Sequence, residues 1–310
     1  MNPTSAAKNP EPRAHHFVPQ CWLAGFTETG KKNGRLWVTD LSRQKQWPTT
    51  PANAAHIRDF YRLSDPAPDP VVVEKFFSEL ESQIAPLLKS LDAELREPKK
   101  DELHALLQFM AFQWVRVPRF RPFALQILDS LTRRGIAEYL ETPETWNAGL
   151  QEAGIDPDTP GADYERSKAF FEAGKFNIVA ETDWYIQRAF KDVESIVPLL
   201  RDRFWGASFS EKGRFVGSDN PVCLDGPRGD MVGFKNADAV FYPVGRHVFL
   251  TGTLQRVKRP PFTLNYIAQM NTMILLMADV QIYSHVPDFF WADEKRRAQT
   301  EWQLFSKEKF

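Results

Sequence analysis

The pattern of hydrophobic and polar residues divides the chain into three segments. Between residues 35 and 63, short runs alternate apolar and polar side chains, which is typical of β-strands. From residue 71 to residue 200, apolar side chains recur at every third or fourth position, as they do on one face of a helix. Between residues 203 and 284, short apolar runs again indicate strands. Strands at both ends with helices between them predict an α+β protein.

We expect the two strand-rich segments to share one antiparallel sheet packed on a central helical bundle, because either segment alone would make a thin sheet. This arrangement predicts a single domain over residues 14–286, and a separate helical middle domain is the alternative. Residues 1–13 contain several prolines and no apolar run, which predicts a disordered tail rather than a signal peptide. Residues 287–310 are rich in charged side chains and are predicted to form a helical tail.

The composition is that of an ordinary globular protein. Of the 310 residues, 43% are hydrophobic and 25% are charged, and the net charge of -1 does not indicate a nucleic-acid partner. Cys21 and Cys223 are the only cysteines, which favours reduced thiols and a cytoplasmic location. The longest apolar run, near residues 273–277, is far shorter than the roughly 20 residues of a membrane-spanning helix.

Two adjacent histidines, His15 and His16, stand just before Pro19 and Gln20. Imidazole carries protons near neutral pH and is the commonest metal ligand. The proline favours an extended chain before it, so the two rings should point to opposite sides. One histidine is then a candidate catalytic base or metal ligand with Gln20 beside it as a substrate-binding residue. The alternative is that both histidines are structural.

The double histidine is also similar to the first motif of HNH-type metal nucleases, in which one residue binds the metal and the next acts as the base. That motif requires an asparagine and a histidine on a following short helix. Asn33, Asn53 and His56 are poorly placed for this role, because their region of the chain has the pattern of strands.

A polar group, Ser218-Asp219-Asn220, precedes Pro221 at the end of a predicted strand. Aspartate and asparagine commonly form tight turns by bonding to nearby backbone, which is one interpretation. The other is a functional site, with Asp219 as a catalytic carboxylate or metal ligand, Asn220 as a polar donor and Ser218 as a substrate-binding hydroxyl.

Arg116 lies on a helix that is apolar on nearly every side, so its guanidinium is predicted to be buried. A buried guanidinium keeps its charge and requires an anionic partner. Pairing with Glu81, Asp92 or Asp219 would be structural. The alternative is recognition of an anionic substrate, with Arg119 at the end of the same helix.

Several of these motifs occur in a recognisable order: His-His-Phe-Val-Pro-Gln at residues 15–20, Gln-Trp-Val-Arg-Val-Pro-Arg at 113–119 and Ser-Asp-Asn-Pro-Val at 218–222. With the residues between them, the chain resembles a largely bacterial family catalogued as domain of unknown function 4238. The resemblance spans residues 14–286 and favours one continuous domain. It implies no reaction, and it singles out these polar residues as the ones to follow.

Two functional hypotheses result. The first is a metal-assisted hydrolase of a phosphate-containing substrate, similar to a nuclease or phosphodiesterase, with a divalent metal held by His16 and Asp219 and an anion held by Arg116. It requires the histidine motif and the Ser-Asp-Asn turn to meet beside Arg116. The second is a non-catalytic module that binds a small anionic ligand, a nucleic acid or a protein in a stress, toxin or phage-response setting.

Overall fold

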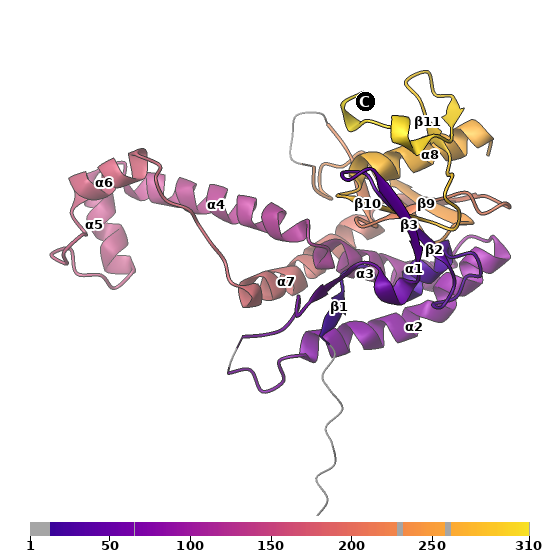
Figure 1. The fold of residues 1–310 in the computed structure, drawn as a ribbon. Helices are drawn as coiled ribbons and strands as arrows, with labels where there is room; N and C mark the ends of the chain where they lie inside the picture. Colours follow the sequence, from indigo (N-terminus) through magenta and orange to yellow (C-terminus); the bar gives the residue numbers. More distant parts are fainter. Residues whose placement is uncertain (1–12, 65, 228–231, 258–261, 310) are drawn as a thin grey trace, which may run out of the picture. The chain divides into compact units, whose positions relative to one another are not determined.

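The computed structural model describes residues 13–64, 66–227, 232–257 and 262–309 (Figure 1). Its elements confirm the α+β class. The chain forms two compact units. We call Met1–Arg119 together with Ile186–Phe310 the main unit, and Phe120–Tyr185 the helical unit. The tail predicted at residues 1–13 lies outside the described residues except for its last position.

The strands all fall in the main unit, and most of the helices do too. The helices are α1 (Gln20–Leu23), α2 (Val72–Glu94), α3 (Lys100–Arg116), α4 (Phe120–Tyr139), α5 (Pro143–Glu152), α6 (Tyr164–Glu172), α7 (Thr182–Arg201) and α8 (Leu264–Met277). The strands are β1 (Ala14–His16), β2 (Leu36–Asp40), β3 (Lys45–Thr49), β4 (His56–Arg58), β5 (Phe204–Phe209), β6 (Gly217–Ser218), β7 (Cys223–Asp225), β8 (Ala239–Pro243), β9 (Val248–Thr253), β10 (Gln281–Ser284), β11 (Trp291–Ala292) and β12 (Ala298–Gln299). Helices α4, α5 and α6 belong to the helical unit.

The first four-stranded sheet joins distant parts of the chain. Its strand order is β3-β2-β10-β6, so two N-terminal strands pair with two C-terminal ones. Val38 of β2 lies opposite Tyr283 of β10, and all the pairings are antiparallel. Both residues are buried. The prediction that the two ends of the chain share an antiparallel sheet is therefore confirmed.

The second four-stranded sheet has the order β5-β9-β8-β7 and is built from C-terminal strands alone. Helix α8 packs on it through Ile267 and Ile274, which lie in one apolar cluster with Phe241 and Phe249 of the sheet. The N-terminal segment is anchored to this sheet by Trp22, whose indole N–H donates to the carbonyl of Pro243 at 2.8 Å.

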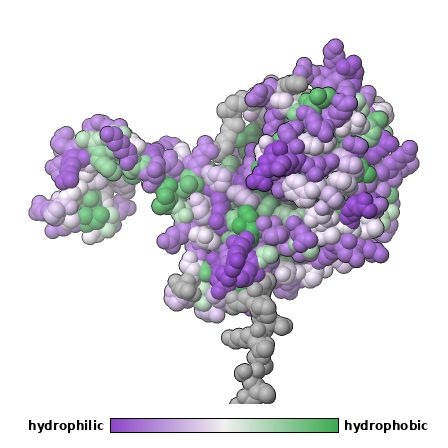
Figure 2. Space-filling model, in the orientation of Figure 1, coloured by the Kyte–Doolittle hydropathy of each residue, from purple (hydrophilic) through white to green (hydrophobic). Residues whose placement is uncertain are grey.

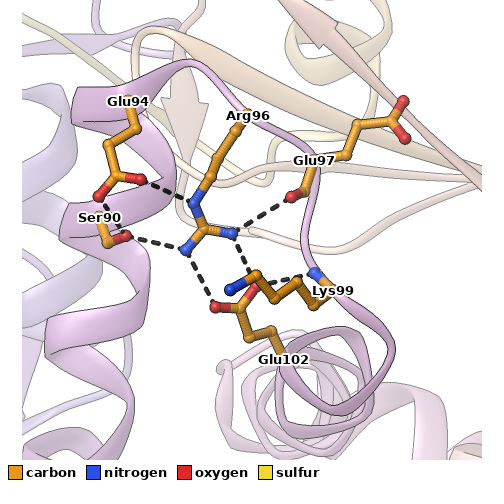
Figure 3. A network of polar contacts seen from close by, with 6 residues as sticks. All are labelled: Ser90, Glu94, Arg96, Glu97, Lys99 and Glu102. Atoms are coloured by element: carbon orange, nitrogen blue, oxygen red, sulfur yellow. Dashed lines mark hydrogen bonds and ion pairs between the residues drawn. The ribbon is translucent and has the colours of Figure 1, made fainter.

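Helices α2, α3 and α7 pack together through phenylalanine rings. Phe76 lies 5.1 Å from Phe112 and 5.2 Å from Phe190, measured between ring centroids. The connection between α2 and α3 is fixed by charge: the Arg96 guanidinium donates to both carboxylate oxygens of Glu102, at 2.7 and 2.9 Å (Figure 3). Such a bidentate ion pair restricts the angle between α2 and α3.

Two predicted elements were wrong. The strand pattern expected up to residue 63 extends too far, since β4 ends at Arg58 because Asp59 adopts a left-handed conformation, with φ of 56°, that no strand continues. The helical tail expected at residues 287–310 is a short β11–β12 hairpin followed by two 3-10 turns. Its aromatic side chains, including Trp291 and Trp302, are buried in the apolar cluster under α8, and this burial outweighs the local preference for helix.

The described surface is mainly hydrophilic, with apolar residues in small patches on the face that Figure 2 shows. Exposed apolar side chains such as Leu131 and Phe170 are scattered singly, which is ordinary for a globular protein. Among the described residues, no helix has both the length and the apolar character needed to cross a membrane.

Candidate functional site

His15 and His16 point to opposite sides of β1, as the extended chain predicts. His15 is fully buried, and its Nδ1 accepts a hydrogen bond from the backbone N–H of Tyr61 at 2.9 Å. The His15 and Tyr61 rings stack at 5.9 Å with 7° between their planes. His15 therefore holds the segment after β4 in place against β1.

His16 faces the other way and lies against β4. Its Nε2 is 3.2 Å from the carbonyl of Ala52, and its ring is 5.4 Å from the ring of His56, edge to face. The side-chain amide of Gln20 is 3.4 Å from the imidazole. Burial lowers the pKa of His16 to about 4. The imidazole is therefore neutral at pH 7, with Nε2 donating to the carbonyl.

Arg116 is buried, as predicted, with 2% of its surface exposed. Its Nη1 donates to Glu81 at 3.0 Å, and its Nη2 donates to the carbonyl of His16. The guanidinium carbon lies 4.2 Å from the centroid of the Phe77 ring. The Tyr61 hydroxyl donates to the carbonyl of Arg116 itself. Of the partners considered from sequence, Glu81 is the one that Arg116 uses.

A second carboxylate, Glu74, lies within electrostatic reach of this pair. Burial raises its pKa to about 7, while the charge of Arg116 acts in the opposite direction. Among the described residues, Oε2 of Glu74 has no hydrogen-bond partner, and neither do the two polar atoms of the Gln113 side chain. We call Glu74, Glu81, Gln113 and Arg116 the buried arginine centre. With a pKa of about 7, raised mainly by burial and further by the charge of Glu81, Glu74 is about half protonated at neutral pH.

The carboxylate of Asp219 is occupied by the backbone. Its Oδ1 accepts from the N–H of Asp279 at 2.8 Å, and its Oδ2 accepts from those of Val280 and Gln281 at 2.7 and 2.8 Å. Burial nevertheless raises its pKa to about 6. Three backbone donors, 60 to 62 residues farther along the chain, make Asp219 the group that fixes the entry into β10. The nearby-backbone contact expected of the turn is made by Ser218 and not by the Asp219 carboxylate.

The neighbours of Asp219 bind the C-terminal end of α8. The Asn220 side chain donates to the carbonyl of Met277 at 3.0 Å, and Arg119 donates to the same carbonyl at 2.9 Å. The Ser218 hydroxyl donates to the carbonyl of Asn220 at 2.9 Å. Arg119 therefore joins the Ser-Asp-Asn turn, whereas Arg116 joins the histidine strand. The structure divides the predicted site residues between two separate groups.

The predicted metal ligands do not fit a shared metal ion. Both carboxylate oxygens of Asp219 are taken by amides, and Nε2 of His16 is taken by a backbone carbonyl. Within the described ranges, no three His, Cys, Asp or Glu residues are grouped as metal ligands. The thiols of Cys21 and Cys223 are free and buried, and burial raises the pKa of each to about 12, so both stay protonated.

A cavity of about 520 Å³ lies elsewhere, between the second sheet and α8. Phe204 and Gly206 of β5 lie on one face of the sheet because they are two residues apart, and Thr251 of β9 is directly opposite Gly206. Tyr266 and Met270, one turn apart on α8, form the other wall. Gly206, on the edge strand β5, contributes only backbone to this wall.

Arg203 lines this cavity and is the best candidate for a ligand-binding residue. It is 5% exposed, and its Nη2 donates to the carbonyls of Phe234 and Ala237, both at 2.8 Å. Its Nε and Nη1 have no hydrogen-bond partner in the part of the chain that the structure describes. Buried guanidinium donors without acceptors are rare and require an explanation. A bound anion would supply the missing acceptors.

The cavity is electropositive. Arg256 is the second cation on its wall, and its guanidinium carbon is 5.5 Å from the centroid of the Phe204 ring. No described residue that lines the cavity is an aspartate or a glutamate. Burial lowers the pKa of Arg203, and the charge of the exposed Asp238 acts in the opposite direction. Arg203 stays positively charged despite the lowered pKa, because an arginine side chain keeps its proton in proteins.

Sequence analysis missed both cavity arginines. Arg203 lies in the short connection between α7, which ends at Arg201, and β5, so it belongs to no periodic pattern that would predict its burial. Arg256 follows β9 in a loop where an arginine is usually a surface residue. In the sequence, Arg203 is marked only by its position just before a strand, and many surface arginines have the same position.

A family model described as "Protein of unknown function (DUF4238)" matches residues 14–288. The match begins at the first residue of β1 and ends after β10, so it includes the buried arginine centre, the Ser-Asp-Asn turn and the cavity. Comparison with curated proteins gives no match, and neither does comparison with solved structures.

Replacing Arg116 by methionine should destabilise the protein strongly. Arg116→Met removes the cation between Glu81 and the His16 carbonyl and leaves their acceptors inside the core. Breaking a buried ion pair costs about 3 kcal/mol or more. Urea unfolding measures the loss. The control is Arg35→Met, since Arg35 and Glu28 are 61% and 58% exposed, and such pairs contribute less than about 1 kcal/mol. Equal losses in the two variants would contradict the assignment.

The Glu74→Gln variant should gain stability relative to the wild type as the pH rises. The pKa of Glu74 is about 7 in the folded protein and 4.5 for an ordinary glutamate, so the folded state keeps a proton that the unfolded chain releases. The free energy of unfolding of the wild type therefore falls as the pH rises through this window. Glutamine does not titrate.

Urea unfolding at several pH values between about 4 and 8 checks this difference. The lowered pKa of His16 makes the free energy of unfolding rise with pH. This contribution is present in both proteins and cancels when the two are compared. Glu79→Gln, on the exposed face of the same helix, is the matched control. If the wild type and the Glu74→Gln variant gave parallel curves, Glu74 would not be protonated in the folded state.

Proposed function

The chain belongs to the DUF4238 family, and we propose that it binds a small phosphate-containing anion in the cavity between the second sheet and α8. The observation that carries this proposal is Arg203, whose buried guanidinium has two nitrogens without acceptors at the wall of an electropositive cavity. Arginine is the side chain best suited to phosphate, because its planar group presents several donors in a fixed geometry.

The fixed position of the Arg203 guanidinium supports specific binding of an anion. Two backbone carbonyls fix its Nη2, so the guanidinium loses little conformational freedom when an anion binds. A preorganised donor binds more tightly than a flexible surface side chain for this reason. Arg256 adds a second positive charge from the loop after β9.

Binding without catalysis accounts better for the residues of this cavity. Its described wall offers the hydroxyls of Ser208, Thr251, Thr253 and Tyr266, but no histidine, aspartate, glutamate or cysteine that could act as a general base. The hydrolase hypothesis required an imidazole, a carboxylate and a guanidinium in one group, and those residues are engaged in two structural groups. We therefore favour the ligand-binding hypothesis.

Titration calorimetry with inorganic phosphate tests the proposal. The wild type should bind phosphate, and added salt should weaken the binding because the interaction is between charges. Arg203→Met should lower the affinity about tenfold or more, which is the effect of losing one or two hydrogen bonds to a charged group. Asp238→Asn should raise it, since it removes a negative charge that acts on Arg203.

Arg256→Met serves as a second variant because Arg256 is exposed and its loss should leave the fold intact. It should also weaken phosphate binding, whereas the distant and exposed Arg35→Met should not. Circular dichroism of each variant distinguishes lost binding from lost structure. Phosphate affinity that is the same in the wild type and in a folded Arg256→Met variant, with no effect of Asp238→Asn, would overturn the proposal.

A further inference from the structure

The cavity is much larger than a phosphate group. At about 520 Å³ it lies within the range of sites for small organic molecules. Inorganic phosphate is a single small ion and would leave most of this volume to water. The residues on the other walls therefore indicate which chemical groups the ligand has besides its phosphate.

Aromatic rings stand on two sides of the cavity. Phe204 comes from the edge strand β5 and is 47% exposed, and Tyr266 comes from α8. The exposed Phe204 ring offers an apolar surface that a ligand can cover. Arg256 already lies over the Phe204 ring, which shows that a flat cationic group can be accommodated near this ring. A planar aromatic ring can pack in the same manner.

Hydroxyl groups lie between the cationic and aromatic parts. Thr251 is opposite Gly206, and its Oγ1 is buried with no hydrogen-bond partner among the residues described. Ser208 and Tyr266 share a hydrogen bond of 3.0 Å, in which either oxygen can be the donor. These groups suit a ligand segment that carries hydroxyls of its own, such as a sugar.

We infer that the ligand is a nucleoside monophosphate, an inference that rests on the proposed anion-binding function. Its phosphate binds Arg203, its sugar faces the hydroxyls of Thr251 and Ser208, and its base stacks against Phe204. Stacking on an aromatic side chain tolerates every base, so this geometry selects nucleotides as a class without choosing one base.

Titration calorimetry with adenosine monophosphate, adenosine and inorganic phosphate tests this inference. The monophosphate should bind at least about tenfold more tightly than phosphate, which is the effect of one stacked base. Phe204→Leu should remove most of this advantage, which is read as the ratio of monophosphate affinity to phosphate affinity because the Phe204 ring also packs against Arg256. Phe204→Tyr keeps the ring and should retain the advantage. Because Phe204 is half exposed, both variants should fold.

The outcomes separate this inference from the proposed function. If phosphate binds in an Arg203-dependent way but the monophosphate binds no more tightly, the nucleotide inference is wrong and anion binding stands. If the monophosphate is favoured equally by the wild type and Phe204→Leu, stacking on Phe204 is wrong. If neither ligand binds the wild type, the proposed function fails and this inference fails with it.

Discussion

The buried charge of Arg116 is the constraint on which the main unit depends. A guanidinium cannot lose its proton in a protein, so the fold must surround it with acceptors. Glu81 of α2 and the carbonyl of His16 accept from its two terminal nitrogens, its Nε has no acceptor among the described residues, and the carbonyl of Arg116 receives the Tyr61 hydroxyl. One side chain thereby fixes the N-terminal strand, two helices and the segment after β4 relative to one another. The histidines contribute to the same purpose, since both bond to backbone.

Two buried arginines, Arg116 and Arg203, differ in the partners that surround them. Both are buried arginines, and both donate to backbone carbonyls. Arg116 also has a carboxylate partner, which balances its charge inside the core. Arg203 has only carbonyl partners among the described residues, and its Nε and Nη1 donate to no acceptor there, whereas Arg116 leaves only its Nε without one. The same chemistry stabilises the fold at Arg116, and we propose that it binds an anion at Arg203.

Much of this arrangement could be predicted from sequence where it depends on local periodicity. Alternation indicated β2 and β3, and the apolar surroundings of Arg116 on its helix indicated burial and a partner such as Glu81. The alternatives considered for Asp219 were a local turn and a functional carboxylate, whereas its carboxylate accepts from the distant backbone before β10 and at its start. The cavity could not be predicted, because it depends on how β5 and β9 align and on which strand face α8 covers. No periodic pattern around Arg203 records these long-range pairings.

The central claim is that the wall of this cavity recognises a phosphate through Arg203. A crystal structure of the protein with adenosine monophosphate tests it most directly. Our account requires electron density for the phosphate beside the free nitrogens of Arg203, with the base on the face of Phe204. Density for the nucleotide at another place on the protein, with the cavity holding only water, would contradict it.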